Sequence, residues 1–429
     1  MDNETKKVLD FLNCGSEHVF LTGNAGTGKT TLINTYRDQT DKNIAVVAPT
    51  GVAAVNIKGE TIHSFFGFPP NITPERAVQE AKRTRKAKLF QSLDCLVIDE
   101  ISMVRADLLD SIDQFLQTVR RHKISFGGVR VIMVGDLHQL PPVVTSAERE
   151  AIFSAYKSPY FFSSLCFQKL VSGLYKQIVY FELKTIHRQT DKKFIDLLNR
   201  VRTNQTTQAD LDILNSCLVD GEGLDDHILL TTINDTADKI NQIKLEEIPG
   251  SLHVFHAQTI GDFNEKQAPS SNELHLKTGA KVMLLNNDPD NRWINGTIGT
   301  VMKVMDKEVM VKLQTGEIET VGPFTWTAYK THFLEDENKI ESIEVGSFKQ
   351  LPLRLAWAIT IHKSQGKTFQ KVAIDFGRGA FAHGQVYVAL SRATSLSGLR
   401  LIRPLNSQGI ITDPLVSEFL SNLDSFKGF

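Results

Sequence analysis

Short runs of consecutive apolar residues alternate with amphipathic stretches over the first third of the chain. Four such runs occupy residues 18–22, 44–48, 95–99 and 130–134. Continuous apolar runs of this length predict strands of a parallel sheet that is covered on both faces. Between the last two runs, residues 105–121 repeat apolar positions at helical spacing, which predicts a helix packed on that sheet. The pattern indicates an α/β fold.

A second alternating region begins near residue 177. Its apolar runs lie at 177–181, 227–232, 371–376 and 399–402, with a helical stretch over 237–248. Between residues 286 and 346 the pattern changes to short stretches of alternating apolar and polar residues, separated by residues typical of tight turns. This pattern predicts a small inserted β-barrel. A smaller insertion in the first domain spans about residues 56–88. We therefore expect one domain over 1–175, a second over 176–285 and 347–429, and a β insertion over 286–346.

Composition narrows the class of protein. At 429 residues, with 41% hydrophobic and 23% charged residues, the chain suits two to four globular domains. A net charge of −1 argues against a protein that coats DNA nonspecifically, although a local cationic groove remains compatible. Four scattered cysteines indicate neither disulfides nor a zinc site. Residues 1–7 precede no apolar export signal, so we expect a cytoplasmic protein without membrane spans, nucleoid-associated if bacterial.

A glycine-rich segment, Gly23-Asn24-Ala25-Gly26-Thr27-Gly28-Lys29-Thr30, lies between the first predicted strand and a predicted helix. Glycines let backbone N–H groups close around phosphate, and the helix N-terminus favours negative charge. We expect Lys29 to reach the β- and γ-phosphates of ATP and Thr30 to bind Mg²⁺. The residues predicted to contact the nucleotide here are Gly23, Ala25, Gly26, Thr27, Gly28, Lys29, Thr30 and Thr31.

Polar residues that follow later strands complete a hydrolytic site. Asp99 is expected to hold Mg²⁺, and Glu100 to orient and deprotonate the attacking water. Gln139, just past the strand at 130–134, is placed to contact both water and γ-phosphate. Arg188 and Arg392, both in the second region, are candidates for arginines that neutralise the transferring phosphoryl group across a cleft.

Several further stretches carry a family resemblance. Together with the motifs above they resemble a superfamily 1B helicase, closest to the petite-integration-frequency family, with the RecD-like helicases as more distant relatives. The most specific stretch runs from Glu100-Ile101-Ser102-Met103-Val104 to Gly135-Asp136-x-x-Gln139-Leu140-Pro141-Pro142. The other matching stretches are residues 48–54, 61–66, 126–128, 361–366 and 389–393.

The resemblance implies two RecA-like domains with ATP between them and single-stranded DNA across their top. It also implies that Gly366 contacts nucleotide, that 56–88 is a strand-separating wedge, and that the β insertion is SH3-like. The implied activity is ATP hydrolysis coupled to 5′-to-3′ movement on single strands and at single-strand/duplex junctions, in DNA repair, replication or telomere maintenance. A monomer is expected, which could dimerise on DNA. Thr5 stands where relatives carry an adenine-recognising glutamine, so selectivity for ATP is open.

We expect two sets of DNA contacts, one on each domain, which we call the two DNA tracks. An enzyme that moves along DNA must bind any sequence, so it contacts the phosphate backbone and stacks on the bases. The residues assigned to the tracks are Pro49, Thr50, Gly51, His63, Ser64, Asn295, His362, Lys363, Ser364 and Gln365. For His63 a structural role is equally plausible, and Asn295-Gly296 is equally read as a plain hairpin turn. One of Phe65 and Phe66 is assigned to a pin that splits base pairs. The basic run 82–88 would attract duplex or simply be a solvated helix face.

Two other functions fit the same motifs. An RNA helicase of the superfamily would respond equally to single-stranded RNA and DNA. A nucleotide-gated DNA clamp would bind without unwinding, but such a protein has no need of Glu100, Arg188 and Arg392. A nuclease is not indicated, since no second acidic cluster follows the ATP motifs.

Overall fold

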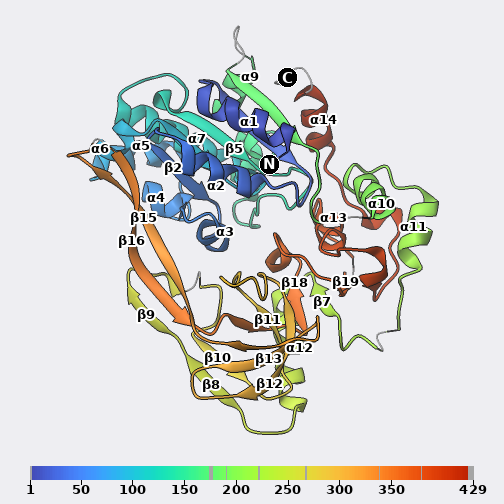
Figure 1. Ribbon diagram of the computed structural model, residues 1–429. Helices are drawn as coiled ribbons and strands as arrows, with labels where there is room; N and C mark the ends of the chain where they lie inside the picture. The colour runs from blue at the N-terminus through green and yellow to red at the C-terminus, as the bar shows by residue number, and fades with distance from the viewer. Residues whose placement is uncertain are drawn as a thin grey trace.

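The first part of the chain forms a six-stranded parallel sheet in the order β3-β2-β4-β5-β1-β6 (Figure 1). The computed structural model describes residues 2–172, 177–189, 191–220, 223–265, 268–337, 339–377 and 379–423. The strands are β1 (His18–Gly23), β2 (Ile44–Ala48), β3 (Glu60–Thr61), β4 (Cys95–Ile98), β5 (Arg130–Val134) and β6 (Ile178–Leu183). All four strands predicted in this region are confirmed. The expected boundary at residue 176 is wrong, because β6 pairs in parallel with β1 and closes this first sheet.

Both faces of the first sheet are buried, as the continuous apolar runs require. Alternate residues of β1 point to opposite cores, Phe20 to one and Val19 and Leu21 to the other. The predicted helix over 105–121 is confirmed as α7 (Ala106–Arg120). The other helices of this unit are α1 (Asn3–Cys14), α2 (Lys29–Gln39), α3 (Gly51–Asn56), α4 (Ile62–Phe66), α5 (Pro74–Arg83), α6 (Ala87–Ser92), α8 (Arg149–Ala155) and α9 (Leu165–Ser172).

A second parallel sheet, ordered β18-β7-β19-β20, forms the second α/β unit. Its strands are β7 (Ile228–Thr231), β18 (Ala358–Thr360), β19 (Val372–Asp375) and β20 (Leu399–Leu401). The helices of this unit are α10 (Lys192–Arg202), α11 (Gln208–Asn215), α12 (Asn234–Glu247) and α13 (Gln385–Leu390). The runs predicted at 227–232, 371–376 and 399–402 are therefore strands of one sheet.

The antiparallel part of the chain is larger than the predicted span 286–346. It begins at β8 (His253–His256) and ends at β17 (Leu353–Leu355). Its main sheet has the order β14-β13-β12-β11-β17, and β10 pairs with β8. The remaining strands are β9 (Gln258–Gly261), β10 (Glu273–Leu276), β11 (Lys281–Leu284), β12 (Ile298–Val304), β13 (Val309–Leu313), β14 (Ile318–Val321), β15 (Phe324–Leu334) and β16 (Lys339–Gln350).

The long hairpin of β15 and β16 extends from this region to the first unit (Figure 1). The Thr331 amide donates to the Glu60 carboxylate at 2.6 Å, and the Ile340 amide donates to Asn43 Oδ1 at 2.7 Å. Lys88, in α6 at the end of the basic run 82–88, pairs with Glu335 near the hairpin tip at 2.6 Å. The hairpin thus connects the β region to the insertion predicted over 56–88.

The C-terminal helix α14 (Pro414–Leu423) returns to the first unit, which corrects its expected place in the second. Val416 and Leu423 join the core of the first sheet, and the Phe419 ring stacks on Phe162 at 4.3 Å between centroids. The ribbon shows α14 beside the first unit near α9 (Figure 1). Within the described ranges, no helix has both the length and the apolar composition needed to cross a membrane.

Candidate nucleotide cleft and nucleic-acid interface

The glycine-rich segment forms a tight loop between β1 and α2. Gly26 and Gly28 have φ of 83° and 82°, in the left-handed region, and Gly28 is the N-cap of α2. A Cβ on Gly26 would lie 2.5 Å from the Arg188 Cβ, so glycine lets the two segments approach. The space beside the Gly28 Cα is open, because no heavy atom lies within 4 Å of the position that a Cβ would take. The loop therefore exposes backbone N–H groups and the N-terminus of α2 to a phosphate-sized ligand.

Lys29 lies at the mouth of this loop. Its ammonium donates to the carbonyls of Gly23 at 2.8 Å and Asn24 at 2.9 Å. Burial lowers the pKa of Lys29, and the Asp136 and Glu100 carboxylates oppose that effect. Thr27 is buried and donates to the Asn24 carbonyl, whereas Thr30 and Thr31 are exposed in the first turn of α2.

Asp99 and Glu100 follow β4 at the same edge of the sheet. Glu100 has a φ of 51°, which is unusual for a residue with a side chain and turns the chain sharply into the cleft. The Asp99 carboxylate accepts from the Glu100 amide at 2.9 Å and faces the Thr30 hydroxyl. Burial, then the charge of Asp99, raises the pKa of Glu100 to about 7. A carboxyl that titrates near neutrality suits a general base.

Gln139 lies beyond β5, in a buried loop that also contains Asp136. Gln139 Nε2 donates to the Asp136 carboxylate at 3.3 Å. Burial alone would raise the pKa of Asp136, but the charges of Arg202 and Lys29 lower it to about 2. Arg202, on α10 of the second unit, lies 3.2 Å from Asp136 and 3.8 Å from Glu182. This buried ion pair joins the two units beside the phosphate loop.

Arg188 lies on the segment between β6 and α10, against the phosphate loop. Its Nη2 donates to the Gly366 carbonyl at 3.2 Å, and the His187 amide donates to the Gly26 carbonyl at 2.9 Å. The buried Nη1 has no hydrogen-bond partner among the described residues. Burial also lowers the Arg188 pKa. A buried guanidinium nitrogen without a partner favours an anion site, because leaving such a donor unpaired is costly.

Arg392 is buried, with 1% of its surface exposed, and its donors are directed to backbone and hydroxyl oxygens. It donates to Val388 O at 2.8 Å, to Lys367 O at 3.1 Å, and more weakly to Ser364 O at 3.4 Å. Burial, then the charge of Arg188, lowers its pKa well below the usual value. Arg392 therefore anchors the segment 364–367 to α13, in addition to its predicted place in the cleft.

Three residues that cross the cleft were not predicted. Arg202 pairs with Asp136, Tyr387 OH on α13 accepts from the Ala25 amide at 3.2 Å, and Asn199 on α10 accepts from the Asn24 side chain at 2.8 Å. None lies in a segment with glycine, strand-end or charge-pattern signals of its own. Their importance comes from contacts with residues 66 to 362 positions away.

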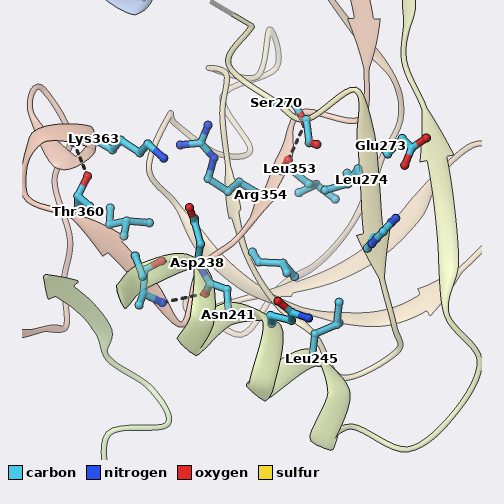
Figure 2. A pocket seen from close by; sticks show the side chains of 17 residues that line it. Asp238, Asn241, Leu245, Ser270, Glu273, Leu274, Leu353, Arg354, Thr360 and Lys363 are labelled. Atoms are coloured by element: carbon cyan, nitrogen blue, oxygen red, sulfur yellow. Dashed lines mark hydrogen bonds between the residues drawn. The ribbon is translucent and has the colours of Figure 1, made fainter. Parts of the chain in front are cut away.

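On the second unit, His362 and Lys363, which are both predicted to contact DNA, lie exposed in a turn after β18. Lys363 and Arg354 point toward one another over a cavity of about 490 Å³, with Asp238 facing them (Figure 2). Burial lowers the pKa of Lys363 and of Lys367, the latter to about 8, and the charge of Arg354 lowers both further. Cations crowded in this way favour an anionic ligand such as phosphate.

Two residues of the same motif are not placed as expected. Ser364 is fully buried, and its hydroxyl donates to Ile361 O at 2.7 Å, so its side chain is not on a DNA surface. The Gln365 side chain points into the nucleotide cleft, where it contacts Glu100 and Gln139. A 3-10 turn sends successive side chains in different directions, and for that reason adjacent motif residues reach different sites.

The first unit's predicted DNA residues gather around α3 and α4. Pro49 and Thr50 are half-buried, and the Thr50 hydroxyl caps α3 by accepting from the Ala53 amide. Gly51 and Ser64 line a groove of about 240 Å³ against the β15–β16 hairpin. The Ser64 hydroxyl donates to Glu60 at 3.0 Å, and burial lowers the pKa of the half-buried His63.

The expected pin is wrong. Phe65 and Phe66 are 0% and 3% exposed and pack with Phe68, Phe90 and Phe115 in one aromatic cluster. Such rings contribute to the core and cannot separate bases without unfolding it.

Asn295 lies in a turn that contacts the second track. Asn295 Oδ1 accepts from Lys367 Nζ at 2.6 Å, and its amide donates to Asn287 Oδ1 at 2.8 Å. The adjacent Gly296 has a φ of 102° and packs against Lys367. The turn is therefore joined to the segment 362–367, which is more than a plain hairpin turn requires.

Comparison with known proteins gives consistent results. Residues 1–212 match the family model described as PIF1-like helicase, and residues 307–420 match a model described as helicase. The chain is 34% identical to the ATP-dependent DNA helicase Pif1 of Bdellovibrio bacteriovorus, over 98% of this chain and 92% of that one. It is 35% identical to human ATP-dependent DNA helicase PIF1 over 95% of its length, but spans 61% of that longer protein.

Solved structures of a Bacteroides sp Pif1 are similar over 99% of this chain and 97% of that one, at 36% identity. The TM-score is 0.90 to the complex with ADP-AlF4 and 0.66 to the form bound to single-stranded DNA. The fold is shared in both cases. The arrangement of the parts differs more from the second structure than from the first.

Proposed function

The chain belongs to the PIF1-like helicase family, and from this premise we propose that it is an ATP-dependent DNA helicase. The observation that carries the proposal is one cleft built from both α/β units. The first unit supplies Lys29, Glu100 and Gln139. The second unit supplies Gln365 and Tyr387, and Arg188, on the segment between β6 and α10, has a buried Nη1 with no partner among the described residues. Such a cleft can change shape when a nucleotide is hydrolysed in it, because the nucleotide contacts both units.

The residues of the cleft fit ATP with Mg²⁺. Lys29 and the N-terminus of α2 would hold the phosphates, and Arg188 would neutralise charge on the γ-phosphoryl group. The Thr30 hydroxyl and the Asp99 carboxylate face each other and would hold the ion. No group of three or more His, Cys, Asp or Glu in the described part of the chain could hold a metal, so phosphate oxygens and water would complete its shell.

Hydrolysis would proceed from Glu100 as base. With a pKa of about 7, its carboxylate can take a proton from water while Gln139 Oε1 orients the same water. Movement of the second unit, with Gln365 and Tyr387, relative to the phosphate loop would then open and close the cleft. The alternative of a clamp that binds without hydrolysis is disfavoured, because a clamp needs neither a base with a raised pKa nor an arginine with an unpaired donor beside the phosphate loop.

Single-stranded DNA would run past both units. On the second unit, Lys363 and Arg354 (Figure 2) would contact its phosphates, together with the exposed His362. On the first unit, Thr50, Gly51 and His63 would do so. We propose 5′-to-3′ movement, a cytoplasmic location if the organism is bacterial, and action as a monomer that could pair on DNA. The five-stranded β region would act as an SH3-like accessory domain, and the segment 56–88 with the hairpin tip as the wedge.

The test is ATP hydrolysis with and without oligodeoxythymidine, and with an RNA of equal length. Wild-type protein should respond to DNA, and Lys29→Ala should lose hydrolysis but retain DNA binding. Lys6→Ala, an exposed lysine on α1, is the matched control and should behave as wild type. Hydrolysis by Lys29→Ala at the wild-type rate would contradict the site, and equal stimulation by RNA would favour an RNA helicase.

A further inference from the structure

The Gln365 side chain bridges the two units at the centre of the cleft. Its Nε2 lies 3.4 Å from Glu100 Oε2 and 3.3 Å from Gln139 Oε1. Both acceptors belong to the first unit, and Gln365 follows the turn His362–Ser364 of the second. One nitrogen thus contacts the two oxygens that the proposed mechanism assigns to the attacking water.

The chemistry of these three groups explains the position. A primary amide nitrogen carries two N–H donors and no acceptor, and a water molecule likewise carries two donor hydrogens. A water placed for attack would donate one hydrogen to Glu100, which removes it, and the other to Gln139 Oε1. The Gln365 amide makes the same two donations, but it is not a nucleophile and Glu100 cannot usefully deprotonate it.

We propose that Gln365 occupies the position of the attacking water and restrains hydrolysis until DNA displaces the turn that carries it. The inference rests on the proposed function, since it requires ATP hydrolysis at Glu100 and DNA contact at the turn. Gln365 is then a positioning residue that couples the two ligands, and not a DNA contact as its motif suggested.

The surroundings of Gln365 provide the mechanical link. Its amide donates to the His362 carbonyl at 3.2 Å, so its backbone moves with the exposed His362 and Lys363. Arg392 donates to the Ser364 and Lys367 carbonyls and ties the same segment to α13. Both contacts of the Gln365 side chain are at the long end of the hydrogen-bond range. A small rotation of the turn would therefore break them and admit water between Glu100 and Gln139.

The restraint by Gln365 also explains why a helicase would not hydrolyse ATP without bound single-stranded DNA. A phosphate bound by Lys363 on the outer side of the turn changes the equilibrium between the two positions of Gln365, because only one of them leaves the cleft free. The DNA and the attacking water are then linked through one short segment, residues 362–365, without a contact between them.

The test uses full-length Gln365→Ala, with the ATPase rate measured without DNA and at saturating oligodeoxythymidine. The DNA-independent kcat should rise roughly five- to tenfold, since two hydrogen bonds no longer hold the water position closed. The ratio of DNA-stimulated to basal rate should fall by a similar factor. The Kd for oligodeoxythymidine should change less than about twofold, because the side chain faces away from the track. Gln314→Ala, on the β region, is the control and should keep the wild-type ratio.

Two outcomes overturn the inference. A basal rate that stays the same or falls means that Gln365 does not restrain hydrolysis, and an unchanged ratio means that it does not couple DNA to the cleft. A thermal melt of each variant separates these outcomes from loss of folding. If wild type responds to DNA and Lys29→Ala is inactive while Gln365→Ala gives either outcome, the proposed function stands and this inference alone fails.

Discussion

The buried ion pair between Asp136 and Arg202 connects the two α/β units, and its removal has a predictable cost. The Arg202 Nη2 lies 3.2 Å from Asp136 Oδ1, and the side chains are 9% and 0% exposed. A pKa lowered from 3.8 to about 2 corresponds to roughly 2.5 kcal/mol favouring the carboxylate, part of it from Lys29. Breaking a buried pair leaves an unpaired charge and costs about 3–5 kcal/mol. Because Lys29 still compensates part of the Asp136 charge, we expect Arg202→Ala to lower the free energy of unfolding by somewhat less, about 2–4 kcal/mol.

The effect should depend on pH in a defined direction. Because the folded-state pKa of Asp136 is depressed, the pair stabilises the protein fully above pH 4 and progressively less as pH falls toward 2. Urea unfolding at pH 7.5, followed by circular dichroism, therefore measures the full difference. The KM for ATP should also rise, since Asp136 lies beside Lys29 and Gln139 and the pair holds the units together around them.

The matched control is Arg200→Ala, on the same helix. Arg200 pairs with Asp210 at 2.6 Å, but Arg200 is 38% exposed and the Asp210 carboxylate also accepts from the Thr207 amide and hydroxyl. The carboxylate therefore keeps partners without Arg200, and the loss of Arg200 should cost less than about 1 kcal/mol. If Arg202→Ala unfolds at the same urea concentration as wild type, or no earlier than Arg200→Ala, the pair does not hold the units together and the reasoning is refuted.

Four further results are expected. The kcat for ATP should rise with pH through about 7, because Glu100 must be ionised to act as base, and a rate flat from pH 6 to 8 would exclude it. Arg188→Ala should lower kcat by about 10³-fold with an unchanged melting temperature. Arg392→Ala should lower both kcat and the melting temperature, since Arg392 donates to backbone carbonyls that it holds in place. Equal melting temperatures of the two variants would contradict the structural role of Arg392. Lys363→Ala should reduce the slope of log K against log salt for single-stranded DNA by about 1, and an unchanged slope would remove it from the track. Phe66→Ala should destabilise the fold by about 3–5 kcal/mol, as measured by urea unfolding, whereas a stable variant defective only in unwinding would restore the pin.

Local signals located most of the first unit's chemistry in the sequence. The loop before α2 and the acidic pair after β4 are both at strand ends, and parallel strands bring such ends to one edge of the sheet. The glycine-rich segment and the acidic pair, each at the end of an apolar run, therefore suffice to place Lys29, Asp99 and Glu100 together. The same logic indicated Gln139 beyond β5.

The remaining contacts depend on pairing that no local pattern encodes. The run at 177–181 predicted a strand, but periodicity does not say that β6 pairs with β1 and not with the second sheet. Arg202 and Tyr387 acquire their partners only when α10 and α13 dock against the phosphate loop. The paired phenylalanines fitted both a pin and a core, and burial on several sides decides for the core. Gln365 was assigned with its neighbours, while the turn directs its side chain elsewhere.

The central claim is that ATP hydrolysis in the cleft between the two units drives unwinding of DNA. The most direct measurement is single-turnover unwinding of duplexes that carry a 5′ or a 3′ single-stranded tail, with ATP and Mg²⁺ and with the Lys29→Ala variant in parallel. We expect wild type to open the 5′-tailed duplex only when ATP is present, and Lys29→Ala to open neither. Selective opening of the 3′-tailed duplex would contradict the direction, and opening by Lys29→Ala would contradict the claim itself.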